Sequence, residues 1–210
     1  MEKDELKELE DYYNNLLLMG ETSFVYGCFE ISKTKDGKWK LANCINYLVD
    51  ESMIEELIIP DFIQIIGAGA FEDYPYSVYE LIIPEGVERI ELKAFRCCVI
   101  RNLKLPCTLK YIGDCAFSRC NIEELYIPDN VEEIGEMAFY KNAYLNSVSL
   151  PSGISLQKWA FEGTGIRCSK IATLEVRKRT PRTRKLYIKA NDSTFYNSSF
   201  EELAINYIKK

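Results

Sequence analysis

The dipeptide Ala-Phe recurs along this chain at a nearly constant interval, and this repetition limits the possible folds more than any other feature. Its five copies occupy residues 70–71, 94–95, 116–117, 138–139 and 160–161, with steps of 24, 22, 22 and 22 residues. A period in this range is typical of repeat proteins, in which one copy cannot bury its apolar side alone. Stacked copies share a continuous core, so the repetition predicts a solenoid.

Each copy also carries an L-x-x-L-x-L frame that is followed by a proline. The frames are Ile54/Leu57/Ile59, Val78/Leu81/Ile83, Ile100/Leu103/Leu105, Ile122/Leu125/Ile127 and Leu145/Val148/Leu150. Their last two apolar positions lie two residues apart, which is the period of a strand with one buried face. Proline lacks the N–H that a ladder needs, so it ends each strand. We therefore expect one short strand per copy, in a parallel sheet about 20–25 Å across.

After the proline, two aliphatic residues follow at intervals of three. They are Ile63/Ile66, Val87/Ile90, Leu109/Ile112 and Val131/Ile134. The fifth copy is one residue shorter here, so Ile154 aligns while Leu156 comes early. We expect these aliphatics and the Ala-Phe pair to turn the chain back and to fill the coil interior. Phenylalanine is the large interior residue, and alanine lies where two turns approach closely.

The combined pattern, L-x-x-L-x-I-P-x-x-V-x-x-I-G-x-x-A-F-x-x-C, resembles the BspA-like class of leucine-rich repeats. The segment 122–142, IEELYIPDNVEEIGEMAFYKN, matches almost throughout, and 100–120, IRNLKLPCTLKYIGDCAFSRC, supplies the terminal cysteine, Cys120. The glycine of the pattern stands at Gly67, Gly113 and Gly135, whereas the second copy has Glu91. The resemblance covers about residues 54–167. It implies a curved solenoid used for recognition, in a class with many secreted or surface-displayed members.

The flanking regions are interpreted as caps. Residues 2–19 predict an amphipathic helix, whose apolar stripe is Leu6, Leu9, Tyr13, Leu16 and Leu17. This helix is either a cap on the first coil or a helix that dimerises or docks a partner. Residues 23–49 predict a β-hairpin that turns at Asp36-Gly37 and shields the edge of the sheet. Residues 171–178 and 185–190 predict two strands, and 200–208 a short helix.

The predicted architecture is thus a mainly β leucine-rich-repeat solenoid with short parallel strands on its concave face. An N-terminal helix-plus-hairpin cap covers residues 1–50, five repeats cover 51–167, and a C-terminal β/α cap covers 168–210.

The composition argues against an enzyme, and we expect neither a cofactor nor a metal. The chain has no histidine, which removes Ser-His-Asp and Cys-His catalysis and the usual general base at neutral pH. Its eight cysteines form no CxxC pair, so we interpret them as small buried residues, with a zinc site or disulfide framework as the alternative. The acidic N-terminus and the lack of a long apolar run predict a cytoplasmic location, or a secreted one if a leader was removed.

The favoured site is a protein-binding face formed by the two outward columns of the predicted sheet. One column precedes the central leucine and comprises Glu56, Glu80, Asn102, Glu124 and Ser147; the other follows it and comprises Ile58, Ile82, Lys104, Tyr126 and Ser149. Exposed apolar residues with a charged rim suit a protein partner, whose identity the sequence does not give. The alternative is that the N-terminal helix or hairpin covers Ile58 and Ile82.

Two charged regions offer other functions. A basic run without acids contains Arg177, Lys178, Arg179, Arg182, Arg184, Lys185 and Lys189. It could contact nucleic acid, another acidic partner or an import receptor, or it could be a solvated hairpin. The acidic residues Glu55, Glu56, Glu80, Glu123, Glu124, Glu132 and Glu133 could instead mimic a ligand of a basic protein surface, or serve only solubility.

Overall fold

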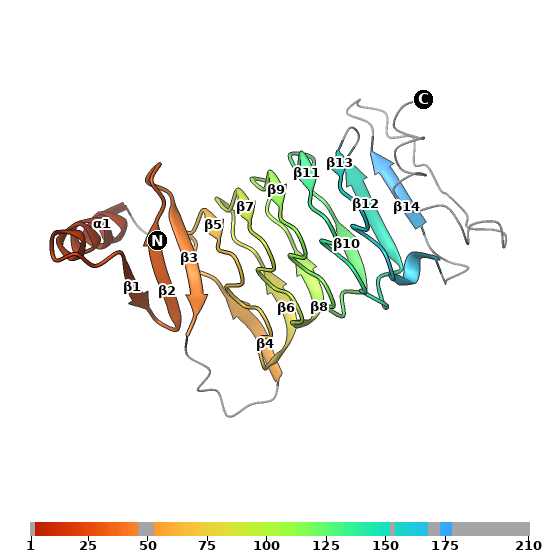
Figure 1. Cartoon of the computed structure of the whole chain (residues 1–210), viewed down its shortest axis with the longest axis horizontal. Coiled ribbons are helices and arrows are strands. Elements are labelled where there is room, and N and C mark those ends of the chain that lie inside the picture. Colours follow the sequence, from red (N-terminus) through yellow and green to blue (C-terminus); the bar gives the residue numbers. More distant parts are fainter. Residues whose placement is uncertain (1–2, 46–52, 152–153, 168–172, 178–210) are drawn as a thin grey trace.

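The computed structural model describes residues 3–45, 53–151, 154–167 and 173–177, and these form a β-solenoid with one helix at its N-terminal end. Each complete coil contains one longer strand and one strand of two residues. The longer strands are β4 (Met53–Ile58), β6 (Ser77–Ile82), β8 (Val99–Lys104), β10 (Glu124–Tyr126), β12 (Ser147–Pro151) and β14 (Thr173–Arg177). Backbone pairing joins β4, β6 and β8 in one group and β10, β12 and β14 in another. Figure 1 shows both groups as one row along the molecule, which we call the long-strand sheet.

The long strands run parallel and in register. Leu57 of β4 pairs with Leu81 of β6, which pairs with Leu103 of β8. Farther along, Leu125 of β10 pairs with Val148 of β12, and Val148 pairs with Leu174 of β14. The repeat frame therefore predicted these strands correctly. The strand predicted at 171–178 forms as β14, and it extends the long-strand sheet by parallel pairing with β12.

A second sheet, which the sequence analysis did not predict, forms the opposite side of each coil. Its repeat strands are β5 (Ile65–Ile66), β7 (Arg89–Ile90), β9 (Tyr111–Ile112), β11 (Glu133–Ile134) and β13 (Ser155–Leu156). They place the second aliphatic residue after each proline in one ladder. Leu156 pairs with Ile134, so the shorter fifth copy regains the register of the others. We call this the short-strand sheet.

The interior between the sheets contains a continuous stack of phenylalanine rings. The rings of Phe71, Phe95, Phe117, Phe139 and Phe161 lie 4.8, 5.1, 5.4 and 5.3 Å apart and are parallel to within 8°. All five side chains are buried, as is the alanine before each of them. The prediction of an interior Ala-Phe column is therefore confirmed, and ring stacking adds to the burial of apolar surface.

The third residue after the phenylalanine is a buried cysteine, asparagine or threonine in every copy except the first, which has Tyr74. Cys98 and Cys120 each donate a hydrogen bond from Sγ to the phenylalanine carbonyl of the preceding copy, at 2.9 Å. Asn142 donates to the corresponding carbonyl, that of Phe117, at 2.8 Å. Burial raises the pKa of the Cys98 thiol to about 12. These two cysteines are buried as predicted, and their hydrogen bonds link successive coils.

Glycine allows a close approach of adjacent coils at Gly113. A Cβ atom on Gly113 would lie 2.7 Å from the carbonyl carbon of Glu91 and 2.8 Å from the nitrogen of Leu92. Both atoms belong to the backbone of the preceding coil and cannot rotate away. The glycine of the repeat pattern thus permits close stacking of coils.

The N-terminal region extends only the short-strand sheet. Strands β1 (Ser23–Tyr26), β2 (Phe29–Lys33) and β3 (Trp39–Cys44) form an antiparallel meander, and β3 then pairs in parallel with β5. A single hairpin had been predicted here. The additional reversal occurs at Gly27, which adopts a φ of 61°.

Helix α1 (Lys3–Leu18) packs against this meander. Its Tyr13 is buried, lies against Phe24 and Trp39, and donates a hydrogen bond to the carbonyl of Thr22. Leu6, Leu9 and Leu16 also pack on the core, whereas Leu17 is 44% exposed. Figure 1 shows α1 and β14 at opposite ends of the molecule. The predicted elements at 185–190 and 200–208 lie outside the described residues.

Candidate interaction surface

The outward positions of the repeat frame come together on one face of the long-strand sheet. Backbone pairing places Glu56, Glu80 and Asn102 in one column and Ile58, Ile82 and Lys104 in the next. The columns continue with Glu124 beside Ser147 and with Tyr126 beside Ser149. All ten residues of the two predicted columns thus belong to strands of this row, although the Glu56 side chain lies outside the described part.

Two large apolar side chains of this face are open to solvent. Ile58 is 72% exposed and Tyr126 is 56% exposed, while Ile82 is half-buried and Lys104 is exposed. Helix α1 and the β1–β3 meander therefore leave Ile58 uncovered, contrary to the alternative considered from the sequence. An exposed isoleucine and tyrosine on a rigid sheet can contribute apolar contact area to a partner.

Ion pairs between copies order the charged side chains of the face. Lys104 Nζ lies 2.8 Å from Glu80 Oε1, and Arg101 Nε lies 3.3 Å from Glu123 Oε1. The Arg101 guanidinium also lies 6.0 Å from the ring centre of Tyr79. Exposed pairs contribute little to stability, so their main effect here is on orientation and charge.

The residues Tyr79, Arg101 and Glu123 form a third outward column that the sequence analysis did not assign to the binding face. They occupy the first variable position of the frame, one residue before the column of Glu80. Tyr79 is 49% exposed. The repeat frame could have indicated this third column, because a residue between two buried frame positions can face outward.

The acidic residues that were predicted to mimic a ligand of a basic protein surface do not all lie on the same side of the solenoid. Glu80, Glu123 and Glu124 lie with the long-strand sheet, whereas Glu133 is in β11 of the short-strand sheet and Glu132 directly precedes it. Glu80 and Glu123 are moreover paired with cations. The acids therefore do not form a single negative face.

Of the predicted basic segment, only Arg177 belongs to the described residues. It is the last residue of β14 and pairs with Pro151. The other six basic residues, Lys178 to Lys189, lie outside that part of the chain. Nucleic-acid or acidic-partner binding by this segment stays a prediction.

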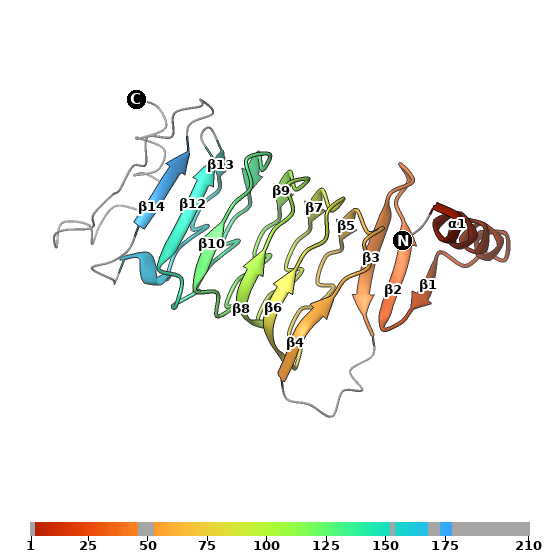
Figure 2. The ribbon, with the colours of Figure 1, turned by 180° about the vertical axis from the view of Figure 1, so that it is seen from behind.

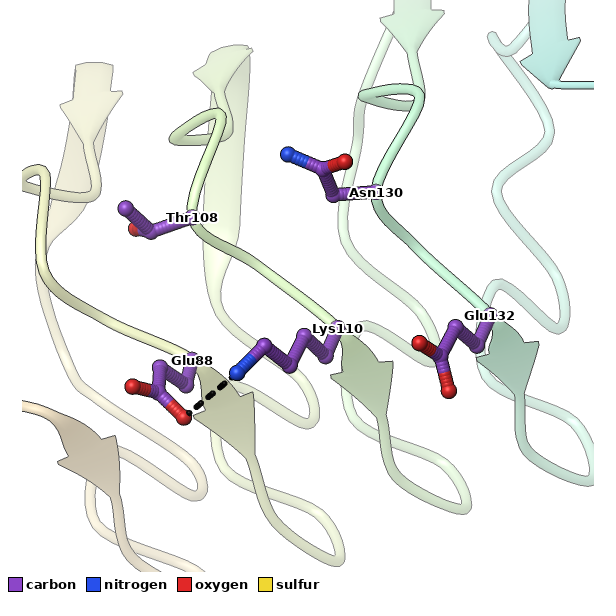
Figure 3. Close-up of a pocket in the computed structure, with 5 residues that line it drawn as sticks. All are labelled: Glu88, Thr108, Lys110, Asn130 and Glu132. Carbon is purple, nitrogen blue, oxygen red and sulfur yellow. Dashed lines mark hydrogen bonds and ion pairs between the residues drawn. The ribbon is translucent and has the colours of Figure 1, made fainter. Parts of the chain in front are cut away.

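A shallow hollow of about 300 Å³ lies beside the short-strand sheet (Figure 3), lined by Glu88, Thr108, Lys110, Asn130 and Glu132. Its polar groups largely bind one another. Glu88 accepts hydrogen bonds from Lys38 at 2.9 Å and Lys110 at 3.1 Å, which together lower the pKa of its carboxyl group. Thr108 donates to the carbonyl of Val87, and Asn130 donates to that of Cys107.

These contacts join three successive repeats. The hollow therefore contributes to the connection between coils and does not present a set of groups directed at one ligand.

In the part of the chain that the structure describes, no three histidine, cysteine, aspartate or glutamate side chains converge in a way that could hold a metal ion. Within the same ranges, no helix has the length and apolarity needed to cross a membrane.

Repeat-encoded coils with a regular interior and a variable outer sheet define a leucine-rich-repeat protein. The chain belongs to the family described as BspA type leucine rich repeat region, whose model matches residues 64–178 in six copies. The family resemblance seen in the sequence is thus confirmed. The matched range includes β14, in agreement with its pairing to β12.

Solved structures share the fold at low sequence identity. A leucine rich cell surface protein from Faecalibacterium prausnitzii is 19% identical with a TM-score of 0.60, over 77% of this chain and 41% of its own. The pneumococcal vaccine antigen PcpA is 20% identical with a TM-score of 0.55, over 77% of this chain and 38% of its own. A leucine-rich repeat protein from Bacteroides ovatus is 22% identical with a TM-score of 0.50, over 75% and 53%.

The chain therefore spans about two fifths of the length of the first two of these structures. No curated protein matches the sequence. The comparisons establish the family and the fold, and the function has to be argued from the surface.

Proposed function

We propose that this protein is a non-catalytic interaction module that binds a partner protein through the outer face of the long-strand sheet. The observation that carries the proposal is the 72% exposure of Ile58 in β4 and the 56% exposure of Tyr126 in β10, at the same outward position of the repeat frame. Exposed large apolar side chains on one face, with charged residues around them, are typical of protein-binding surfaces. Leucine-rich-repeat proteins are commonly interaction modules, which supports the same conclusion.

The charges of the face suit a protein partner better than a uniformly charged polymer. Lys104 and Arg101 are both paired with glutamates of neighbouring copies, so positive and negative groups alternate over the face. Alternating charge around apolar contacts contributes specificity and orientation. The cytoplasmic location predicted from the sequence stays a prediction, and one structural neighbour is described as a cell surface protein.

The proposal is tested with the double variant Lys104→Ala/Tyr126→Ala. The immobilised full chain is exposed to an extract of its source cells, and captured proteins are quantified by mass spectrometry. The matched control is Lys110→Ala/Tyr111→Ala, which removes a lysine and a tyrosine from the short-strand side. We expect a partner whose capture weakens at least about tenfold, or 1.4 kcal/mol, in the first variant only.

Both variants should retain the melting temperature of the parent chain to within a few degrees, because Lys104, Lys110 and Tyr126 are exposed and Tyr111 is only half-buried. Equal capture by the parent chain and the Lys104→Ala/Tyr126→Ala variant would remove this face as the binding site.

A further inference from the structure

The two sheets of the solenoid begin at different places along the molecule. The short-strand sheet begins with β1, β2 and β3, whereas the long-strand sheet begins only with β4. In Figure 2, β4 is the last strand of the long-strand row on the side of β3 and α1. Among the described residues, no strand pairs with β4 on the side away from β6. That edge offers a row of backbone donors and acceptors to which an additional strand can pair.

A groove lies beside this edge and can receive side chains of an added strand. Its volume is about 380 Å³, and it is bounded by the first turn of α1, the β1–β2 turn and the loop after β4. The apolar part of its lining includes Tyr26, Phe29, Ile58 and Phe62. Tyr26 is 42% exposed, and its ring lies edge-on to that of Phe62 at 5.4 Å. The groove is therefore suited to aliphatic side chains.

The charge around the groove selects a basic occupant. Glu5 of α1 and Asp61 of the loop after β4 both line it. Helix α1 as a whole has five acidic residues and two lysines, which gives it a net negative charge. An acidic end of the molecule attracts a positively charged segment over a distance of about 8–10 Å at physiological ionic strength.

The chain itself contains a segment with the complementary chemistry. Residues 184–190, Arg-Lys-Leu-Tyr-Ile-Lys-Ala, combine three basic residues with the alternation expected of a strand. Leu186 and Ile188 fall on one side of that strand, while Lys185, Tyr187 and Lys189 fall on the other. The aliphatic pair suits the groove, and the basic residues suit its acidic surroundings.

The reach of the chain points to a second copy as the source of this segment. The position beside β4 lies six strand spacings from β14, or about 29 Å at about 4.8 Å each. Arg184 follows Arg177, the end of β14, by seven residue steps. Fully extended, they span at most about 25 Å. The segment of the same molecule is therefore too short to begin a strand beside its own β4.

We propose that residues 184–190 of one copy of this chain add as a strand to the β4 edge of a second copy, with Leu186 and Ile188 in the groove. The proposal concerns the edge of the long-strand sheet and shares Ile58 with the proposed partner-binding face, whereas Lys104 and Tyr126 do not line the groove, so Lys104→Ala/Tyr126→Ala tests partner binding separately. A contact between two different surfaces of identical chains is heterologous, so it can repeat from copy to copy.

The test is sedimentation velocity of the full chain over a wide range of protein concentration. We expect the average mass to rise above that of one chain as concentration increases, and to fall again at high salt because the contact is partly ionic. The variant Leu186→Asp/Ile188→Asp should weaken association at least about tenfold by placing carboxylates in an apolar, acidic groove. The control Tyr187→Ser changes the opposite side of the segment and should leave association unchanged.

A second pair of variants tests the groove. Tyr26→Arg adds a positive charge to an exposed position of the lining and should weaken association to a similar degree. Tyr126→Arg makes the same replacement on the outer face and should associate as the parent chain does. A chain that remains monomeric at all concentrations would overturn the proposal. So would association that survives both Leu186→Asp/Ile188→Asp and Tyr26→Arg, since another contact would then be responsible.

Discussion

The interior of the solenoid and the outer face of its long-strand sheet obey different rules, although the same repeat encodes both. Inside, each copy places a phenylalanine on the ring of the one before it, and the stack runs unbroken from Phe71 to Phe161. Outside, the equivalent position of successive copies is Ile58, Ile82, Lys104, Tyr126 and Ser149. The interior is constant because each coil must fit its neighbours, whereas the face can vary without affecting the fold.

The sharpest way to test this contrast is to remove one ring from the middle of the stack. Phe117 is fully buried and contacts Phe95 and Phe139 on its two sides. Phe117→Ala should lower the free energy of unfolding by about 3–5 kcal/mol, as for other deletions of core phenylalanines. Urea denaturation followed by circular dichroism measures this change. Tyr126→Ala is the control on the face and should change the value by less than about 0.5 kcal/mol.

If Phe117→Ala cost less than about 1 kcal/mol, the ring would not be part of a tightly packed interior. The contrast between the constant interior and the variable face would then fail.

A second test addresses the close approach of the coils. In Gly113→Ala the new methyl group meets the backbone of Glu91 and Leu92 at less than 3 Å, so the coils must move apart. We expect a loss of about 1–3 kcal/mol in the same assay. Gln157 occupies the equivalent position of the fifth copy and is exposed, which makes Gln157→Ala a suitable control. An unchanged stability in Gly113→Ala would indicate that the spacing of the coils is less tightly fixed.

The smallest expected effect concerns the thiols that link coils, and it depends on pH. Burial raises the pKa of Cys98 to about 12 from an ordinary value of 9.0, and it also raises the pKa of Cys120. The folded chain therefore retains these protons after the unfolded chain has lost them. The contribution of Cys98 is complete below about pH 9 and is lost as pH rises toward about 12, by about 1.4 kcal/mol per pH unit, and Cys120 changes stability in the same direction.

Urea denaturation at about pH 8 and about pH 10 measures this loss. The variant Cys98→Ala/Cys120→Ala should be less stable at the lower pH, yet should lose less stability between the two values than the parent chain. The control Cys107→Ala removes an exposed cysteine and should behave as the parent does. Equal losses in all three proteins would show that the buried thiols do not titrate in this window.

The sequence predicted the parts of the fold that have a repeated chemical requirement. The long strands follow from the two-residue spacing of Leu57 and Ile59, and the interior column follows from the recurrence of Phe71 and its equivalents. The short-strand sheet was missed because a strand such as Ile65–Ile66 has only two residues, which is too short to display any alternation. Gly27 was placed inside a strand because one glycine does not distinguish a turn from an irregularity.

The backbone of each Ala-Phe turn was also beyond prediction. The residue before the alanine and the second residue after the phenylalanine have positive φ in every copy, for example 56° at Lys93 and 59° at Arg119. Glycine normally marks such positions, and here it appears only at Gly69 and Gly163. Most copies therefore carry no local indication of the conformation, which stacking of the coils imposes.

Two of the three outward columns of the candidate binding face were predicted, because a repeat frame indicates which positions point outward, and the column of Tyr79 was missed. The ion pairs of this face were not predicted, since the pair of Lys104 and Glu80 joins different columns of neighbouring copies. Such a diagonal contact depends on rotamers and on strand spacing. The open edge beside β4 was likewise missed, because it results from the meander joining the other sheet.

The polar position inside the phenylalanine stack bears on how the cysteines of this chain are interpreted. Cysteine, asparagine and threonine all serve there, at Cys120, Asn142 and Thr164, and each donates a hydrogen to a phenylalanine carbonyl. In these copies a short side chain that can donate one hydrogen bond is sufficient, and sulfur has no special part in it. Thiols sealed in this way meet neither oxidants nor reductants, so they would persist unchanged inside or outside a cell. The presence of cysteine at positions 98 and 120 therefore gives no information about the compartment in which the protein resides.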